Sequence, residues 1–153
     1  VRQPGSTLKP VTYLAALRSG LQPNTLVMDS SIVLPPIGQQ NSARAKDYWA
    51  PRNAGGGEGS AVTLRRALED SRNLATAQLM ANGIESSAEQ GLDRICELAV
   101  EAQLYKECNR FYPFILGAQP LRMIDLAAFY AAIANEGARP VPHVIDSVEQ
   151  GGR

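Results

Sequence analysis

The sequence predicts a mainly α protein, in which short helices are joined to one long irregular loop. Three observations carry this prediction. Five segments combine helix start or stop signals with apolar residues, residues 21–62 are interrupted by Pro and Gly, and no region alternates apolar and polar residues over several strands. With 153 residues, the chain is long enough for one domain with a hydrophobic core.

The composition excludes several classes of function. Apolar residues make up 44% of the chain, which is ordinary for a globular domain. Fifteen basic residues balance fifteen acidic ones, so the electrostatic pattern of a nucleic-acid or anionic-membrane binder is missing. No apolar run reaches the roughly 18–20 residues of a membrane span. Because the sequence starts abruptly and without Met, we expect a piece of a longer protein.

The first helix is expected over Thr7–Ser19. Pro4-Gly5 is a turn signal, Ser6 is a favoured N-cap residue, and Gly20 is a natural helix stop. The irregular loop follows, and within it "TLVMDSSIVLP" indicates one short extended segment. A connection of this length in a compact domain is usually functional or mobile.

Two short helices are expected after the loop. Thr63 is the expected cap of the first, Leu64–Asp70, and a polar break at residues 71–73 separates it from the second, Leu74–Asn82. Gly83 is the expected end of the second helix.

A longer amphipathic helix is expected from a capping box at Ser86 and Glu89 to about Leu104. One face of this helix is apolar and carries Leu92, Ile95, Cys96 and Ala99. An alanine-rich helix is expected over Met123–Asn135, and "HVIDSVE" after it indicates the start of a strand.

Two cysteines, Cys96 and Cys108, leave the redox state open. The only histidine is His143, so no Cys/His cluster with zinc spacing exists and no metal is expected. On one straight helix the two cysteines would lie about 18 Å apart, at about 1.5 Å per residue, which is too far for a disulfide. A bridge therefore requires the helix to end between them. We favour two free thiols, since unpaired Cys is commonly buried.

Ser6 and Lys9 are the first candidate catalytic pair. Positions i and i+3 share one face of a helix, so the hydroxyl and the amine can meet. A serine hydroxyl needs a base to become a nucleophile, and a lysine serves as that base when burial lowers its pKa. The alternative is that these residues are only the polar first turn of a helix.

Ser71-Arg72-Asn73 is the second candidate motif. Ser71 can supply a hydroxyl for proton relay, and Asn73 an amide that holds a substrate. The alternative is an ordinary polar turn between two helices, since Ser and Asn are common in turns. A non-catalytic helical interaction module in which both motifs arise by chance stays open at this point.

Three longer stretches resemble one family. "RQPGSTLKP", "VTLRRALEDSRN" and "LGAQPLRMIDLAAFYAAIANEGARP" are similar to the transpeptidase domain of class A penicillin-binding proteins. The resemblance covers nearly the whole chain and is weakest over residues 25–58. It implies that residues 1–153 are the helical subdomain of the penicillin-binding-protein and β-lactamase-like transpeptidase fold, with most of its β-sheet outside this chain.

The resemblance also implies a mechanism. Ser6 would attack the D-Ala-D-Ala bond of a peptidoglycan stem peptide and form an acyl-enzyme, with Lys9 as its base. Ser71 would relay a proton to the leaving amine, and Asn73 would hold Lys9 or the substrate amide. An amine of a second stem peptide would take the acyl group, and β-lactams would acylate Ser6 in the same way. No cofactor is implied.

The parent protein would stand at the periplasmic face of the bacterial inner membrane, anchored through parts outside this chain. Two alternatives keep the fold: a β-lactam-binding sensor, and a DD-carboxypeptidase or β-lactamase.

The sequence departs from the family pattern in two places. The family's third motif, Lys-Thr/Ser-Gly, is missing, because Lys9, Lys46 and Lys106 precede Pro, Asp and Glu. We therefore expect the isolated chain to be inactive. Arg122-Met123 replaces the Ser/Thr-Pro that starts the last helix in the family, which puts the cap of that helix in doubt.

Overall fold

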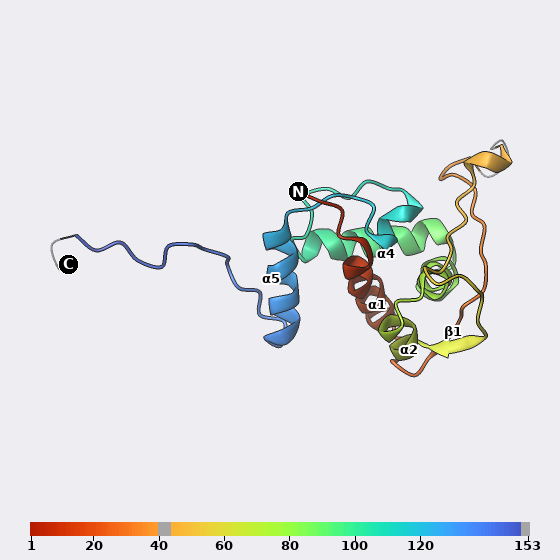
Figure 1. Ribbon diagram of the computed structural model, residues 1–153, viewed down its shortest axis with the longest axis horizontal. Helices are drawn as coiled ribbons and strands as arrows, with labels where there is room; N and C mark the ends of the chain where they lie inside the picture. The colour runs from red at the N-terminus through yellow and green to blue at the C-terminus, as the bar shows by residue number, and fades with distance from the viewer. Residues whose placement is uncertain (40–43, 151–153) are drawn as a thin grey trace.

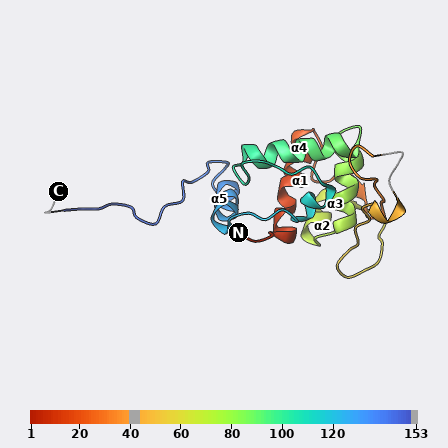
Figure 2. The same cartoon turned by 90° about the horizontal axis from the view of Figure 1, so that it is seen from above.

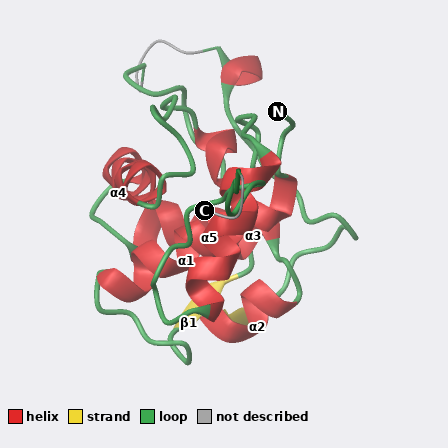
Figure 3. Ribbon diagram, turned by 90° about the vertical axis from the view of Figure 1, so that its left-hand side faces the viewer, coloured by secondary structure: helices red, strands yellow, loops and turns green. Residues whose placement is uncertain are grey.

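The computed structural model describes residues 1–39 and 44–150. Short helices form its body, and a small two-stranded sheet lies at one edge (Figure 3). The C-terminal tail runs away from the body beyond the last helix (Figure 1). The predicted mainly α fold class is confirmed.

The N-terminal segment forms a 3₁₀ turn, η1 (Gly5–Leu8), that continues into helix α1 (Lys9–Arg18). The prediction that Ser6 caps this helix is wrong. Gly5 adopts φ +58° and starts the 3₁₀ turn, which places Ser6 inside it, and Pro4 occupies the cap position without a side-chain hydrogen bond. The Ser6 hydroxyl is therefore not used to cap the helix.

Helices α2 (Leu64–Glu69) and α3 (Asn73–Gln78) flank the polar break, as predicted. The Thr63 side chain accepts a hydrogen bond from the Arg66 amide at 3.2 Å and caps α2. After α3 the chain widens into a π-helical turn, η3 (Leu79–Gly83), so the predicted second helix continues with altered geometry up to Gly83.

Helix α4 (Ala88–Glu101) packs across α1 and η3 (Figure 2). Its cap is Ser87, which accepts from the Gln90 amide at 3.3 Å, and not the predicted Ser86. Gly91 permits the close approach, because a Cβ at this position would overlap the Met80 carbonyl oxygen. The predicted apolar face of α4 is buried in the core, together with side chains from α1, η3 and the 3₁₀ turn η4 (Tyr112–Leu116): Val11, Ala16, Leu79, Met80, Leu92, Ile95, Ala99, Phe114 and Ile115.

Strands β1 (Leu26–Met28) and β2 (Ala61–Thr63) pair antiparallel, with Val27 opposite Val62. The first was predicted as a short extended segment, and the second was not predicted. Their pairing closes the long loop at its base. A short 3₁₀ turn, η2 (Ala45–Asp47), lies farther out in this loop. The closure brings residues near 29 and 53 against α3, where the candidate site lies.

Cys96 and Cys108 form a disulfide, with their Cα atoms 5.5 Å apart. The favoured interpretation of two free thiols is therefore wrong. Helix α4 ends at Glu101, and Gln103 adopts φ +56°, so the chain reverses before Cys108 and meets the geometric condition for a bridge.

Helix α5 (Met123–Ala134) follows the predicted range, and Arg122 occupies its cap position without a side-chain bond to the helix backbone. The predicted strand start is absent, because residues 138–150 form no strand. Among residues 1–39 and 44–150, no helix has the length and apolar character needed to cross a bilayer.

Candidate functional site

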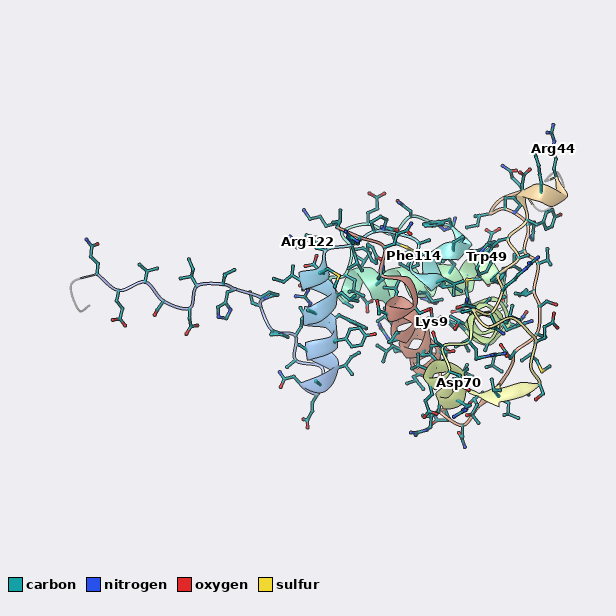
Figure 4. All side chains as sticks on the ribbon, in the orientation of Figure 1. Lys9, Arg44, Trp49, Asp70, Phe114 and Arg122 are labelled. Carbon is teal, nitrogen blue, oxygen red and sulfur yellow. A yellow bond between two sulfur atoms is a disulfide. The ribbon has the colours of Figure 1, made fainter. Side chains whose placement is uncertain are left out.

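The amine of Lys9 is the centre of the candidate site. Lys9 is the first residue of α1, and its side chain points into the helical body (Figure 4) with only 1% of its surface exposed. The amine donates to the Ser71 carbonyl oxygen at 2.5 Å, to Ser71 Oγ at 3.0 Å and to Asn73 Oδ1 at 2.6 Å. The structure thus brings Lys9, Ser71 and Asn73 into one hydrogen-bonded group.

Burial changes the acidity of this amine. Desolvation lowers the pKa of Lys9 from its ordinary 10.5 to about 8, because an ammonium group loses hydration inside the protein. The three oxygen partners satisfy the N–H groups that water would otherwise bind.

Ser71 owes its position to the way in which α2 ends. The Ser71 amide donates to the Leu68 carbonyl at 3.0 Å and the Arg72 amide to the Ala67 carbonyl at 2.9 Å, which is the Schellman pattern. This pattern requires a left-handed residue after the helix, and Ser71 adopts φ +53° there, where glycine is usual. The turn presents both oxygens of Ser71 to Lys9.

Asn73 opens α3 and is fixed from the long loop. Its side-chain amide donates to the Arg52 carbonyl at 2.7 Å. The Oδ1 of Asn53 accepts from the Asn73 amide at 2.8 Å and from the Leu74 amide at 3.1 Å. Asn53 therefore caps α3 from a distant part of the chain, satisfying N–H groups that a helix start leaves unpaired.

Behind the turn lies a carboxylate, Asp29, of which 1% of the surface is exposed. Arg72 Nε donates to Asp29 Oδ2 at 2.6 Å, and Arg72 Nη2 forms an ion pair with the same oxygen. Asn53 Nδ2 donates to both carboxylate oxygens, at 3.2 and 3.4 Å. We call Asp29, Asn53 and Arg72 the Asp29 network. Sequence reasoning missed it, and the unusual length of the loop was the only signal.

Ser6 lies one turn before Lys9, in η1. In a 3₁₀ turn the side chains at i and i+3 eclipse, so Ser6 and Lys9 share a face. Ser6 is exposed, and within residues 1–39 and 44–150 its hydroxyl makes no hydrogen bond. The structure therefore groups three of the four predicted site residues by direct contact and leaves the Ser6 hydroxyl unengaged.

Two contacts hold the turn that carries Ser6 in place. The Gly5 amide donates to the Gly117 carbonyl at 3.2 Å, and a Cβ on Gly117 would overlap the Gly5 backbone. From α5, the Tyr130 hydroxyl donates to the Thr7 carbonyl at 2.8 Å. Both contacts fix the backbone on either side of Ser6.

A hollow of about 430 Å³ borders the site on the side of the long loop. Its lining includes Arg52, Asn53, Glu58 and Leu74. Across the described parts of the chain, no three His, Cys, Asp or Glu side chains are grouped so that they could hold a metal ion.

Comparison with known proteins places the sequence in a family. Residues 1–98 match the penicillin binding protein transpeptidase domain. Over 148 residues, 97% of this chain, the sequence is 32% identical to penicillin-binding protein 1A of Neisseria meningitidis serogroup A. It is 30% identical over 149 residues to penicillin-binding protein 1A of Rickettsia conorii. The chain spans 17% of the length of each of these relatives.

Two solved structures share the fold. Penicillin-binding protein 1A from Haemophilus influenzae superposes with a TM-score of 0.71 at 26% identity, over 88% of this chain and 18% of that one. PonA1 from Mycobacterium tuberculosis gives a TM-score of 0.73 over 92% of this chain and 36% of that one, and at 21% identity it shows a likeness of fold alone. The fold is the helical part of a penicillin-binding-protein transpeptidase fold, and the chain belongs to the penicillin-binding protein transpeptidase family.

Proposed function

We propose that this chain carries the serine nucleophile and its base for a peptidoglycan DD-transpeptidase, within a membrane-anchored cell-wall synthase of the periplasm. Ser6 is the nucleophile, Lys9 the base, Ser71 the proton relay, and Asn73 holds the amine of Lys9. The observation that supports this proposal most is the buried amine of Lys9, held by both members of the second motif.

The lowered pKa of Lys9 has a quantitative consequence. With an ordinary pKa of 10.5, roughly one amine in three thousand is neutral at pH 7. With a pKa of about 8, about one in ten is neutral, a gain of about 300-fold in the form that accepts a proton. General bases work best with a pKa near the operating pH, and burial moves Lys9 in that direction.

The reaction proceeds in two transfers. The Ser6 oxygen attacks the carbonyl carbon between the two D-Ala residues, and the hydroxyl proton passes to the neutral amine of Lys9. The carbon–nitrogen bond breaks, the leaving D-Ala amine takes a proton through Ser71, and an ester remains on Ser6. An amine from a second stem peptide then attacks the ester and gives up a proton, and Ser6 regains its own. β-Lactams acylate Ser6 by the first transfer.

Ser71 is suited to the relay because its bond to Lys9 can reverse. The ammonium form of Lys9 has three N–H groups and meets three acceptors. When the amine is neutral, it has one lone pair, and the Ser71 hydroxyl can donate to it. A proton can therefore move along this contact.

Acylation by a fluorescent penicillin tests the proposal. In the full-length protein that contains this chain, we expect covalent labelling that Ser6→Ala abolishes. Ser19→Ala, at the opposite end of α1, is the matched control and should label normally. Labelling that persists in Ser6→Ala would contradict the proposal. The isolated chain, which lacks a Lys-Thr/Ser-Gly motif, is expected to label poorly.

Transfer to an added amine separates the proposed activity from its alternatives. A transpeptidase passes its acyl group to an amine such as a D-amino acid and releases a new amide. Release of the free acid alone would instead indicate a DD-carboxypeptidase or β-lactamase, and a stable acyl-enzyme with no release would indicate a sensor.

A further inference from the structure

Asp29 is a buried carboxylate that the proposed reaction does not use. It follows β1 directly, only 1% of its surface is exposed, and its hydrogen bonds go to Arg72 and Asn53. A buried charge is costly unless it is paired. Space is reserved for it, since a Cβ on Gly59 would come 2.8 Å from Asp29 Oδ2. An apolar side chain here would avoid the cost of a buried charge, so the carboxylate calls for a specific role.

The two partners of Asp29 reach both sides of the turn that holds Lys9. Arg72 is the residue between Ser71 and Asn73, so an ion pair at its side chain fixes the backbone of this turn. Asn53 holds the other side, because its Oδ1 accepts from the Asn73 amide at 2.8 Å. A further hydrogen bond, from Asn53 Nδ2 to the Gly57 carbonyl at 3.0 Å, fixes the side-chain amide of Asn53.

This turn needs external support. Ser71 has φ +53°, a left-handed conformation that is unfavourable for residues other than glycine. Hydrogen bonds between a guanidinium and a carboxylate are among the stronger ones in proteins. The Asp29 network is therefore placed, and strong enough, to keep a strained turn against the amine.

We propose that Asp29 is a positioning residue that holds the Ser71–Asn73 turn against Lys9 through Arg72 and Asn53. This inference rests on the proposed function. Among the described residues, the carboxylate of Asp29 is hydrogen-bonded to Arg72 and Asn53 and not to Lys9, so its effect reaches the amine through the turn.

Charged and titratable groups around the network come from two elements. Tyr13 faces it from α1, and Asp70 acts on Arg72 from the end of α2. Burial raises the pKa of Tyr13, its hydrogen bond with Thr76 opposes this rise, and the charge of Asp29 adds to it. The hydrogen bond to Asp29 raises the pKa of Arg72, so this guanidinium stays charged across the neutral range.

The first test is the rate of acylation in the full-length protein. Asp29→Asn keeps the shape and removes the charge, and we expect the rate to fall about 10- to 100-fold, the range caused by a small misplacement of catalytic groups. The acylation rate is normalised to the amount of protein that is labelled at the end of the reaction. A smaller amount of folded protein therefore does not lower the measured rate. Asp93→Asn is the matched control. It breaks an exposed ion pair with Arg110 and should leave the rate unchanged.

The pH profile separates positioning from a merely structural role. In the wild type the rate should rise with a midpoint near 8, the pKa of Lys9. When the turn loosens in Asp29→Asn, water reaches the amine, so the midpoint should move upward towards 10.5. A residue that only stabilises the fold would leave this midpoint in place.

Arg72→Lys provides an independent variant if Asp29→Asn does not fold. It keeps the positive charge and loses the fork geometry, so rate and midpoint should change in the same directions. The double variant should be no slower than the slower single one, because the two residues act as a unit.

The inference is overturned if the folded variant labels at the wild-type rate with an unchanged midpoint. Failure of the proposed function would give a different result. In that case the penicillin would not label the wild type, or it would still label Ser6→Ala.

Discussion

At the scale of single residues, Ser71 combines a strained backbone with a side chain that is hydrogen-bonded to Lys9. Its left-handed conformation suits glycine, yet its hydroxyl lies 3.0 Å from the amine of Lys9. If stability alone determined the residue at this position, glycine would be preferred after α2. The serine is explained by the hydroxyl, which is where the proposed relay needs it.

Two substitutions at Ser71 separate stability from chemistry. Ser71→Ala removes the hydroxyl and keeps the strain, whereas Ser71→Gly removes both. We expect the glycine variant to exceed the alanine variant by about 1 kcal/mol in free energy of unfolding. Both variants should acylate more slowly than the wild type, because neither relays a proton. Urea unfolding and penicillin labelling measure the two effects, and a glycine variant with wild-type labelling would exclude the relay.

Residue-level predictions from the sequence succeeded where local chemistry decides the outcome. Thr63 caps α2 as its type and place predict. Ser6 fails as a cap because Gly5 starts a 3₁₀ turn one residue earlier, which no propensity of Ser6 reveals. Lys9, Ser71 and Asn73 were chosen from two short motifs and lie in contact. Their chemical roles stay predictions.

At the scale of elements, η1 rests on the residue that ends η4. Gly117 follows η4 with φ +77°, and its backbone lies against Gly5, directly before Ser6. Neither glycine has a side chain to hold the two backbones apart. The position of the turn that carries Ser6 therefore depends on an element more than one hundred residues away.

Gly117→Ala tests this dependence. Its new methyl group would overlap the Gly5 backbone, so we expect a loss of about 1–3 kcal/mol from overpacking and displacement of Ser6. Slower labelling by penicillin should accompany this loss. Gly38→Ala is the matched control, since Gly38 has a similar φ of +73° but open space around its Cβ position. Equal effects of the two substitutions would show that backbone strain, and not the contact with Gly5, is responsible.

The helices could be predicted because their signals are local, whereas the links between them are not. Strand β2 and the capping of α3 by Asn53 depend on the closure of a long loop. Local sequence patterns do not reveal which distant residues such a closure brings together. The Cys96–Cys108 disulfide depends on where α4 ends and on the reversal at Gln103. The sequence left this pairing open for the same reason.

At the scale of the whole molecule, acidic and basic residues are equal in number, and most ion pairs are exposed. Exposed pairs contribute little to stability. Within the described residues, Lys9 and Asp29 are the charged side chains in the buried set. Buried tyrosines add a second class of titrating groups, with the pKa of Tyr105 raised to about 12. The pH dependence of folding should therefore reflect a few interior groups.

Stability should rise and then fall in alkaline solution. The pKa of Lys9 is about 8 in the folded chain and 10.5 when unfolded, so between these values the unfolded state binds more protons and stability increases with pH, by at most about 3 kcal/mol. Tyr105 acts oppositely: it ionises near pH 10 when unfolded and near 12 when folded, so stability decreases above about pH 10. Urea unfolding measured from pH 7 to 11 should show this maximum. Lys9→Met should lose the rise and keep the fall, and a wild-type curve that is flat from pH 8 to 10 would show that the amine is not desolvated.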